Sequence, residues 1–309
     1  HYRDRRQRQM CIRDRQLGLL KMDFLGLRNL SVIDRTLELI GDEKLDIDNI
    51  PLDDKKTFEL LADGKMTGVF QLESRVAQST SRSLKTNTFE DIVALVALIR
   101  PGPLGAGMHN EFTDRATGRK DIEYLHKDLE EILSETYGVI LYQEQVMQIA
   151  QKISGFELEE ADELRKAMGK KIPKVMEKQR EKFTIGATKN GYSEQFAIEL
   201  FDQIAYFAGY GFNKSHSVPY ALLAYQTAYL KANHPAEYIA ACLTAVKRDK
   251  DRTAIFLSEA RDLGVNVSTP DINESLEDFS VTNNEIVFGI SAIRNVGDIT
   301  AEKIIKERG

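Results

Sequence analysis

The sequence predicts a mainly α-helical protein with small pieces of β structure at its two ends. Through the centre of the chain, apolar residues recur three and four positions apart, which is the period of a helix with one buried face. Near residue 23 and again near residues 279–288, apolar residues follow the shorter period of a strand. A chain of 309 residues is long enough for two or more domains.

The first expected strand lies around residues 20–27. Apolar residues alternate there with Lys21 and Asp23, so a strand would bury the apolar set and present both charges on one polar face. A carboxylate beside a lysine at the end of a strand suits a metal ion and a phosphate together. Asp23 is therefore a candidate metal ligand.

Helices are expected where a helical period ends at a glycine or meets a proline, and Gly155 and Gly169 end two of these periods. Ser217 is expected to cap a later helix that tolerates Pro219 in its first turn. Residues 100–103, with two prolines, predict a rigid turn after a helix. The expected helices cover residues 30–40, 51–61, 89–99, 142–153, 158–168, 173–191, 196–207, 217–232, 235–246 and 251–262.

The character of the sequence changes after the last of these helices. Residues 279–282 and 286–288 are rich in β-branched and aromatic side chains, and residues 283–285 between them favour a turn. This pattern predicts a β-hairpin. A final helical segment follows Val296 and Gly297.

Composition excludes several classes of protein. No run of about 18 apolar residues exists, so we expect no membrane span. The two cysteines, Cys11 and Cys242, form neither a disulfide framework nor a zinc-binding spacing. No secretory signal is evident, and the expected location is the cytoplasm.

Charge is unevenly distributed along the chain. The formal net charge is -6, yet residues 165–182 contain eight basic residues and two acidic ones. Such a run is either a solvated helix face or a phosphate-binding surface. The small number of acids within the run favours phosphate contact.

The first fifteen residues do not fit the rest of the sequence. They contain six arginines and show neither a helical nor a strand period. Residues 10–15 also match what a common transposon sequencing adaptor encodes in one reading frame. We expect an extraneous tail at residues 1–15; the alternative is a genuine basic arm that binds nucleic acid.

Five segments, in order along the chain, carry the most specific signal. They are KMDFLGL at 21–27, VFQLESR at 69–75, ALIRPGPL at 97–104, YGVILYQEQ at 137–145 and FAGYGFNKSHS at 207–217. Together they closely resemble the C-family of bacterial replicative DNA polymerases, the DNA polymerase III alpha subunits. The resemblance implies the end of a polymerase-beta-like palm at 16–30, a helical fingers domain at 31–274 and the start of a duplex-binding region at 275–309.

The resemblance assigns Asp23 as the third catalytic aspartate of the palm and Lys21 as a contact to the phosphates of the incoming nucleotide. A two-metal mechanism needs two Mg²⁺ ions bridged by carboxylates, which one aspartate cannot provide. We therefore expect the other two aspartates upstream of residue 1, and we expect the isolated chain to be inactive.

The remaining implied sites lie in the fingers and beyond. Arg165 and Lys166 resemble a basic pair that meets the triphosphate. Asn213, Lys214 and His216 are candidates for facing nucleotide, and Lys170 and Lys171 for facing DNA. Val296 and Gly297 resemble the second half of a helix-hairpin-helix, in which backbone amides bind one DNA phosphate.

The function implied is DNA-directed DNA synthesis during bacterial chromosome replication. Implied partners are primer–template DNA, a dNTP, the sliding clamp and other replisome subunits. Two alternatives stay open: an error-prone paralogue of the same family, and a non-catalytic module that binds nucleic acid through its basic helix and terminal hairpin.

Overall fold

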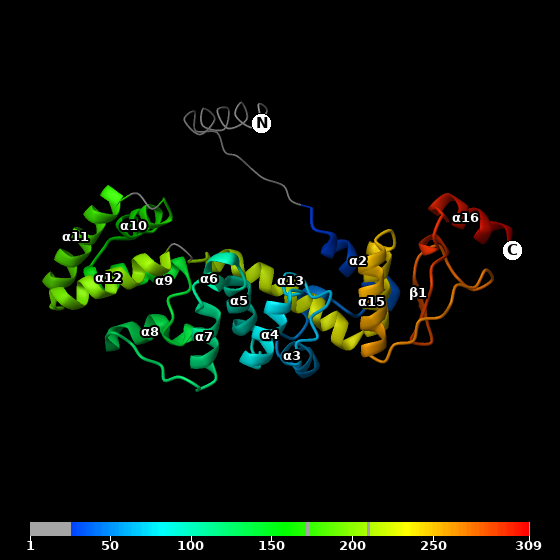
Figure 1. Ribbon diagram of the computed structural model, residues 1–309, viewed down its shortest axis with the longest axis horizontal. Coiled ribbons are helices and arrows are strands. Elements are labelled where there is room, and N and C mark those ends of the chain that lie inside the picture. Colours follow the sequence, from blue (N-terminus) through cyan, green and yellow to red (C-terminus); the bar gives the residue numbers. More distant parts are fainter. Residues whose placement is uncertain (1–25, 171–172, 209–210, 309) are drawn as a thin grey trace, which may run out of the picture.

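The computed structural model describes residues 26–170, 173–208 and 211–308. The fold is mainly α-helical, as predicted, and its helices form an elongated series of three sections (Figure 1). One end holds α9 to α12, the centre holds α3 to α7, and the other end holds α2, α15 and the C-terminal hairpin and helix. α14 packs against α2 and α15 at that end. No helix among the described residues is long and apolar enough to cross a membrane.

The helices and strands have the following bounds. The helices are α2 (Arg28–Ile40), α3 (Lys55–Ala62), α4 (Arg75–Leu84), α5 (Phe89–Leu98), α6 (Pro101–Gly105), α7 (Met108–Ala116), α8 (Glu130–Leu133), α9 (Gln143–Ser154), α10 (Leu158–Lys170), α11 (Pro173–Lys189), α12 (Glu194–Ala208), α13 (Lys214–Asn233), α14 (Pro235–Val246), α15 (Lys250–Asp262) and α16 (Asp298–Glu307). The strands are β1 (Ser280–Thr282) and β2 (Glu285–Val287).

The central section is organised around α5, which packs against α13. Every residue from Asp91 to Leu98 is buried, and a capping box between Thr88 and Asp91 fixes the start of the helix. Residues 100–103 do not form the simple turn that was predicted. Pro101 instead occupies the first position of α6, where its fixed φ suits a helix and its missing N–H costs nothing.

The section made of α9 to α12 has its own apolar core. Gly155 ends α9 in the left-handed region (φ 65°), as predicted. A Cβ on Gly186 of α11 would lie 2.2 Å from the Ser154 carbonyl oxygen, so glycine permits this close crossing of α11 over α9. The prediction that Gly169 ends the preceding helix is wrong, because α10 continues through it to Lys170.

The third section joins α2, α14 and α15 to the hairpin. β1 and β2 pair antiparallel, with Thr282 opposite Glu285. The prediction placed Glu285 in the turn, but only Asn283 and Asn284 form it, with φ of 52° and 61°. Both φ values suit a two-residue hairpin turn, which asparagine tolerates well.

The longest helix, α13, runs from the central section toward the third one (Figure 1). Asn213 caps it and accepts a hydrogen bond from the His216 N–H at 2.8 Å. The prediction that Ser217 caps this helix is therefore wrong. The Ser217 hydroxyl is buried and donates to the Val93 carbonyl at 2.7 Å, and Pro219 lies inside the helix.

Candidate nucleotide and DNA interface

Gln143, the first residue of α9, joins two distant parts of the chain. Its backbone N–H donates to the Phe212 carbonyl at 2.9 Å, and its Nε2 donates to the Gly211 carbonyl at 3.2 Å. Its Oε1 accepts a hydrogen bond from Arg165 Nη1 at 3.1 Å. One side chain therefore ties α10, which carries Arg165, to the segment that leads into α13.

Arg165 and Lys166 share one carboxylate on their own helix. Arg165 Nε donates to Asp162 Oδ1 at 2.8 Å, and Lys166 Nζ lies 2.6 Å from Asp162 Oδ2. Hydrogen bonds from Lys166 and then from Arg165 hold the pKa of Asp162 below its ordinary value. Exposed helical ion pairs of this spacing are worth only about 0.3–0.5 kcal/mol, so an incoming phosphate can replace the carboxylate at low cost.

The N-terminus of α13 is occupied by protein carboxylates. The Lys214 N–H donates to both carboxylate oxygens of Glu144, at 3.1 and 3.0 Å. Lys214 Nζ lies 2.6 Å from Glu135 Oε2 and 5.4 Å from the ring centroid of Tyr142. A carboxylate is favourable there because it satisfies N–H groups and complements the helix dipole. Glu144 thus fills the place that a phosphate would take at this terminus.

A row of rings follows one face of α13 from its N-terminal end. The exposed His216 ring lies 5.5 Å from Phe212 and 4.4 Å from Tyr220, measured between centroids. The Arg100 guanidinium carbon lies 4.1 Å from the Phe212 centroid, and burial lowers the pKa of Arg100. Planar groups arranged in this way offer a surface on which a base can stack.

The basic run at residues 165–182 is partly neutralised by acids that lie outside it. Lys182 Nζ is 2.6 Å from Glu160 on α10, and Arg180 pairs with Asp202 on α12. Together with Asp162, three carboxylates from outside residues 165–182 therefore pair with basic residues of this run. The expectation that few acidic partners surround these residues is wrong, because the partners come from neighbouring turns and from another helix.

The C-terminal unit places Val296 and Gly297 directly before α16. The Val296 N–H donates to the Ile293 carbonyl at 3.0 Å, and Gly297 is the N-cap residue of α16. Gly297 has an ordinary φ of -89°, and a Cβ added to it would meet no atom within 4 Å. Asp298 anchors the unit to the end of α14 through Lys247 Nζ at 2.9 Å.

Known proteins match nearly the whole length of the chain. Residues 29–191 match the finger domain of the bacterial DNA polymerase III alpha subunit, and residues 264–309 match a helix-hairpin-helix motif. The DNA polymerase III subunit alpha of Escherichia coli K12 is 50% identical over 304 residues, and those of Saccharopolyspora erythraea and Thermus aquaticus are 48% and 49% identical. The matches cover 94% of this chain and 24–26% of the relatives.

The chain belongs to the DNA polymerase III alpha subunit family. It spans about a quarter of the length of the curated relatives it matches. The matched finger region contains α10 and Arg165, and the matched helix-hairpin-helix contains α16. Figure 1 shows α10 and α16 at opposite ends of the elongated structure.

The predicted site residues lie in different parts of the chain. Arg165, Lys166, Asn213, Lys214 and His216 belong to the region joined by Gln143, whereas Val296 and Gly297 lie in the C-terminal unit. Lys170 is the last residue of α10. Lys21, Asp23 and Lys171 lie outside the described residues.

No metal centre is formed by the described part of the chain. It contains no group of three or more His, Cys, Asp or Glu side chains placed to hold an ion. The interface built around Gln143 instead arranges cations and N–H groups, which suit phosphates.

Several residues of this interface are not among the predicted site residues. The pairing of Asp162 could have been predicted from the sequence, because Asp162 lies three positions before Arg165 and four before Lys166 on one helix. Gln143 and Arg100 lie inside quoted motifs, but their partners come from the segment before α13, far along the chain. Such long-range contacts leave no periodic signal in the sequence.

Proposed function

We propose that this chain forms the fingers and the beginning of the duplex-binding region of a DNA-directed DNA polymerase, which extends a primer 3′ end with dNTPs. In this proposal the palm ends at residues 16–30, the fingers cover 31–274 and duplex binding begins at 275–309. The observation that carries the proposal is the hydrogen-bonded link from Arg165 through Gln143 to Gly211, because it unites two cationic segments in one interface.

In the proposed reaction, Arg165 and Lys166 exchange Asp162 for the β- and γ-phosphates of the nucleotide. The planar guanidinium of Arg165 can bind two phosphate oxygens, whereas the Lys166 ammonium acts as a point charge. Both groups stabilise the charge that develops on the departing pyrophosphate. Gln143 keeps the Arg165 side chain oriented while this exchange takes place.

The palm completes the proposed site. Two Mg²⁺ ions held by Asp23 and further carboxylates would, when bound, neutralise charge at the attacked phosphate. Lys21 is assigned to the same phosphates. The fingers side chains have a separate task, which is to bind, orient and release the triphosphate.

The row of rings on α13 supports a role in positioning the nucleotide. His216 is exposed, meets Phe212 edge-on and lies tilted against Tyr220, so two neighbouring rings hold its orientation. We assign His216 and Asn213 to the nucleotide base and sugar. Lys214 can also contact the nucleotide, through its ammonium once Glu135 releases it and through its backbone N–H once Glu144 does.

DNA is the proposed partner of the C-terminal unit. The glycine at 297 is required neither by a left-handed backbone nor by a neighbouring atom of the described chain. Close approach of a DNA phosphate to the N-terminal amides of α16 provides a reason for it. We also assign Lys170 and Lys171 to DNA contacts.

The proposal also implies a setting for the longer protein. Primer–template DNA and a dNTP are its substrates, and the sliding clamp and other replisome subunits are its partners. Chromosome replication takes place in the bacterial cytoplasm, so we assign the protein to that compartment.

The proposal is tested with Arg165→Ala in the longer polymerase. Loss of a positioned cation on the leaving group is expected to lower kcat/KM for dNTP by about 100-fold, or about 2.7 kcal/mol, with little change in DNA affinity. Steady-state primer extension measures the first quantity and fluorescence anisotropy with labelled DNA the second. Arg180→Ala is the matched control and is expected to change kcat/KM less than about threefold. Equal effects of the two substitutions would contradict the proposal.

Two further experiments separate the alternatives. Asp23→Ala in the longer protein abolishes turnover if the protein is a polymerase and leaves DNA affinity nearly unchanged; a binding module would have no turnover to lose. Primer extension by the 309-residue chain alone is expected to be undetectable. Misincorporation frequency distinguishes a replicative enzyme from an error-prone paralogue.

A further inference from the structure

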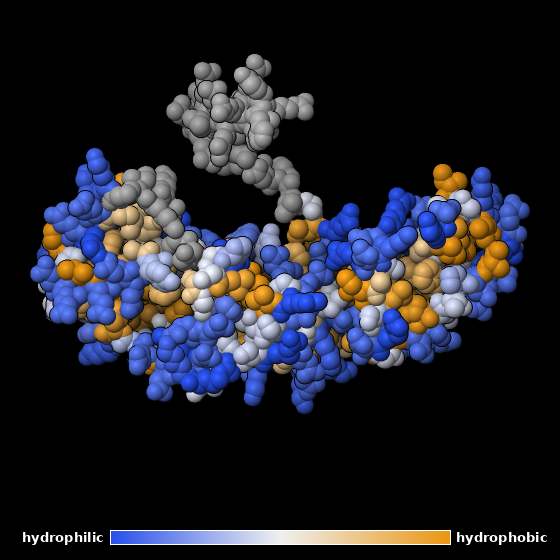
Figure 2. Space-filling view, viewed as in Figure 1, coloured by the Kyte–Doolittle hydropathy of each residue, from blue (hydrophilic) through white to orange (hydrophobic). Residues whose placement is uncertain are grey.

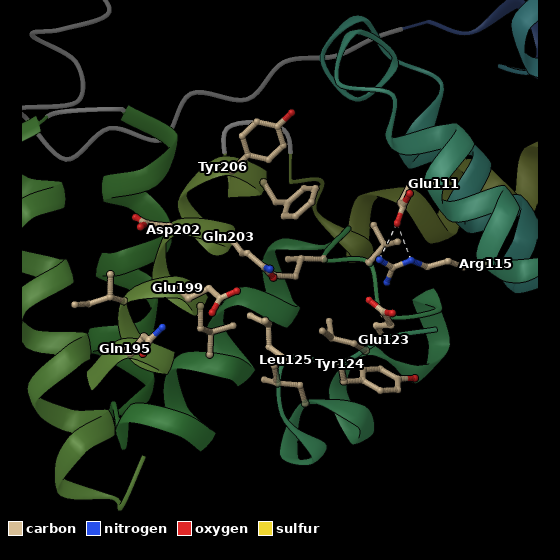
Figure 3. Close-up of a pocket in the computed structure, with 18 of the residues that line it drawn as sticks. Glu111, Arg115, Glu123, Tyr124, Leu125, Gln195, Glu199, Asp202, Gln203 and Tyr206 are labelled. Carbon is tan, nitrogen blue, oxygen red and sulfur yellow. Dashed lines mark hydrogen bonds and ion pairs between the residues drawn. The ribbon is translucent and has the colours of Figure 1, made fainter. Parts of the chain in front are cut away.

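A groove distinct from the nucleotide interface lies between α12 and residues 123–140. Its cavity volume is about 1100 Å³ (Figure 3). None of the predicted nucleotide-binding residues lines it. In Figure 3, Glu199 and Gln203 on α12 face Leu125 and Glu123 on the opposite wall. A cavity of this size exceeds the usual range for a drug-sized ligand, about 300–1,000 Å³.

The floor of the groove is apolar. It includes Leu129, Leu133, Ile140 and Leu200, all of which are buried. Ile198 on the α12 wall keeps 38% of its surface exposed, although it is a large aliphatic side chain. The groove can therefore shelter apolar side chains of a partner and gain from their burial.

The rim of the groove is acidic. Glu123, Glu194 and Glu199 line it and are exposed, and within the described ranges no cationic side chain pairs with them. Two other lining acids are already matched, since Glu111 pairs with Arg115 and Asp202 pairs with Arg180. The groove thus carries an uncompensated negative potential, which repels nucleic acid and attracts basic groups.

The shape of the groove favours a helical occupant. Lining residues recur along α12 at 194, 198, 202 and 206, and again at 195, 199 and 203. These positions form one face of α12 and extend over about 18 Å at 1.5 Å per residue. A partner helix of three turns can lie along that face, with apolar residues on the floor and basic residues at the rim.

We propose that this groove docks a basic amphipathic helix of a partner protein. Charge complementarity selects this occupant: the rim acids need cations, and the apolar floor needs aliphatic side chains on the same segment. A small cation would leave the floor uncovered. A second copy of the chain is disfavoured by its net charge of -6. This docking surface does not depend on the proposed catalytic role of Arg165.

The probe is a fluorescein-labelled 18-residue synthetic peptide in which Leu and Lys follow a helical period. Its binding to the 309-residue chain is measured by fluorescence anisotropy. E123Q/E194Q/E199Q is expected to weaken binding about tenfold, because the small losses from three exposed ion pairs add up. The matched control, D262N/E302Q/E307Q, removes the same charge from α15 and α16 and is expected to change affinity less than twofold.

Two further comparisons test the apolar half of the proposal. Ile198→Ser is expected to weaken the Leu/Lys peptide several-fold and to leave a Ser/Lys peptide, which binds more weakly, unchanged. Circular dichroism and thermal melts verify that each variant is folded. All measurements are repeated on residues 16–309, because the arginine-rich residues 1–15 could compete for the same groove.

The outcomes distinguish docking in the groove from general electrostatic attraction. Loss of binding in the groove variants only, with or without residues 1–15, supports the docking surface. Equal loss in the groove and control variants would show general attraction to a negatively charged protein and would overturn it. Equal affinity for the Leu/Lys and Ser/Lys peptides, or absence of Leu/Lys binding to residues 16–309, would also overturn it.

Discussion

The two ends of α13 carry lysines in opposite circumstances. Lys214 at the N-terminal end keeps 37% of its side chain exposed and pairs with Glu135. Lys231 near the C-terminal end is fully buried. Its ammonium donates to the carbonyls of Lys65 and Thr67, at 2.8 and 2.7 Å, and to Glu259 at 2.6 Å.

The role of a lysine on a helix therefore depends on which groups accept hydrogen bonds from its ammonium. The three N–H groups of the Lys231 ammonium are taken by two backbone carbonyls and one carboxylate, so no donor remains for a ligand. Burial lowers the pKa of Lys231, while the Glu259 carboxylate opposes that effect. Lys214 has side-chain acceptors that can move away. Lys231 therefore belongs to the architecture, whereas Lys214 belongs to a surface that can exchange partners.

Lys231→Met should produce the largest effect. It leaves the Glu259 carboxylate and two carbonyls buried without their donor, which is expected to lower the free energy of unfolding by about 3–5 kcal/mol. Urea denaturation followed by circular dichroism measures the loss. The double variant K231M/E259Q should recover part of it, because the buried charge is also removed. A loss below 1 kcal/mol would break the contrast between the two ends of the helix.

Ser217→Ala should have an intermediate effect. The buried Ser217 hydroxyl donates to the Val93 carbonyl and thereby joins α13 to α5. Its removal leaves that carbonyl without this donor and is expected to cost about 1–3 kcal/mol in unfolding free energy. Ser215→Ala, at an exposed position of the same helix, is the control and should cost less than about 0.5 kcal/mol. Equal losses would show that Ser217 has no special structural role.

Lys214→Met should change stability by less than about 1 kcal/mol, because the ion pair with Glu135 is partly exposed. The sharper readout is functional: KM for dNTP in the longer polymerase should rise several-fold. Thermal denaturation and steady-state kinetics provide the two measurements. A large stability loss with unchanged KM would assign Lys214 to the architecture as well.

The ion pair between Lys247 and Asp298 should give the smallest effect on stability. The Lys247 side chain is 15% exposed, which lies between fully buried Lys231 and partly exposed Lys214. Burial alone would lower the pKa of Lys247, but hydrogen bonds to Asp278 and Asp298 raise it above its ordinary value. The hydrogen bond from Lys247 lowers the pKa of Asp298 from 3.8. The stability from Asp298 is thus complete above pH 3.8 and disappears as the pH falls through its lower folded pKa. Asp298→Asn should flatten this acid limb in pH-dependent denaturation, and an unchanged limb would contradict the assignment.

The sequence predicted most helices because their signals are local. The predicted helix at 235–246 agrees with α14, and Gly155 ends α9 as expected. Ser217 was mistaken for a cap because capping propensity does not reveal which residue already has a tertiary partner. The true cap, Asn213, is itself one of the favoured cap residues.

The candidate site was only partly predictable. The family resemblance implied Arg165 and three residues at the start of α13, which are Asn213, Lys214 and His216. The sequence could not reveal that Gln143 joins these two segments, since its partners lie far apart along the chain. Nor could it show Glu144 at the terminus of α13. Both contacts depend on the path of the chain between α9 and α13, which only tertiary packing defines.

The central claim is that Arg165 and the N-terminal end of α13 act as one nucleotide-phosphate site joined by Gln143. A double-mutant cycle with Arg165→Ala and Gln143→Ala in the longer polymerase tests it most directly, with kcat/KM for dNTP as the readout. The account predicts that the two losses do not add, with a coupling energy of about 1 kcal/mol or more. Losses that add within about 0.3 kcal/mol would contradict it.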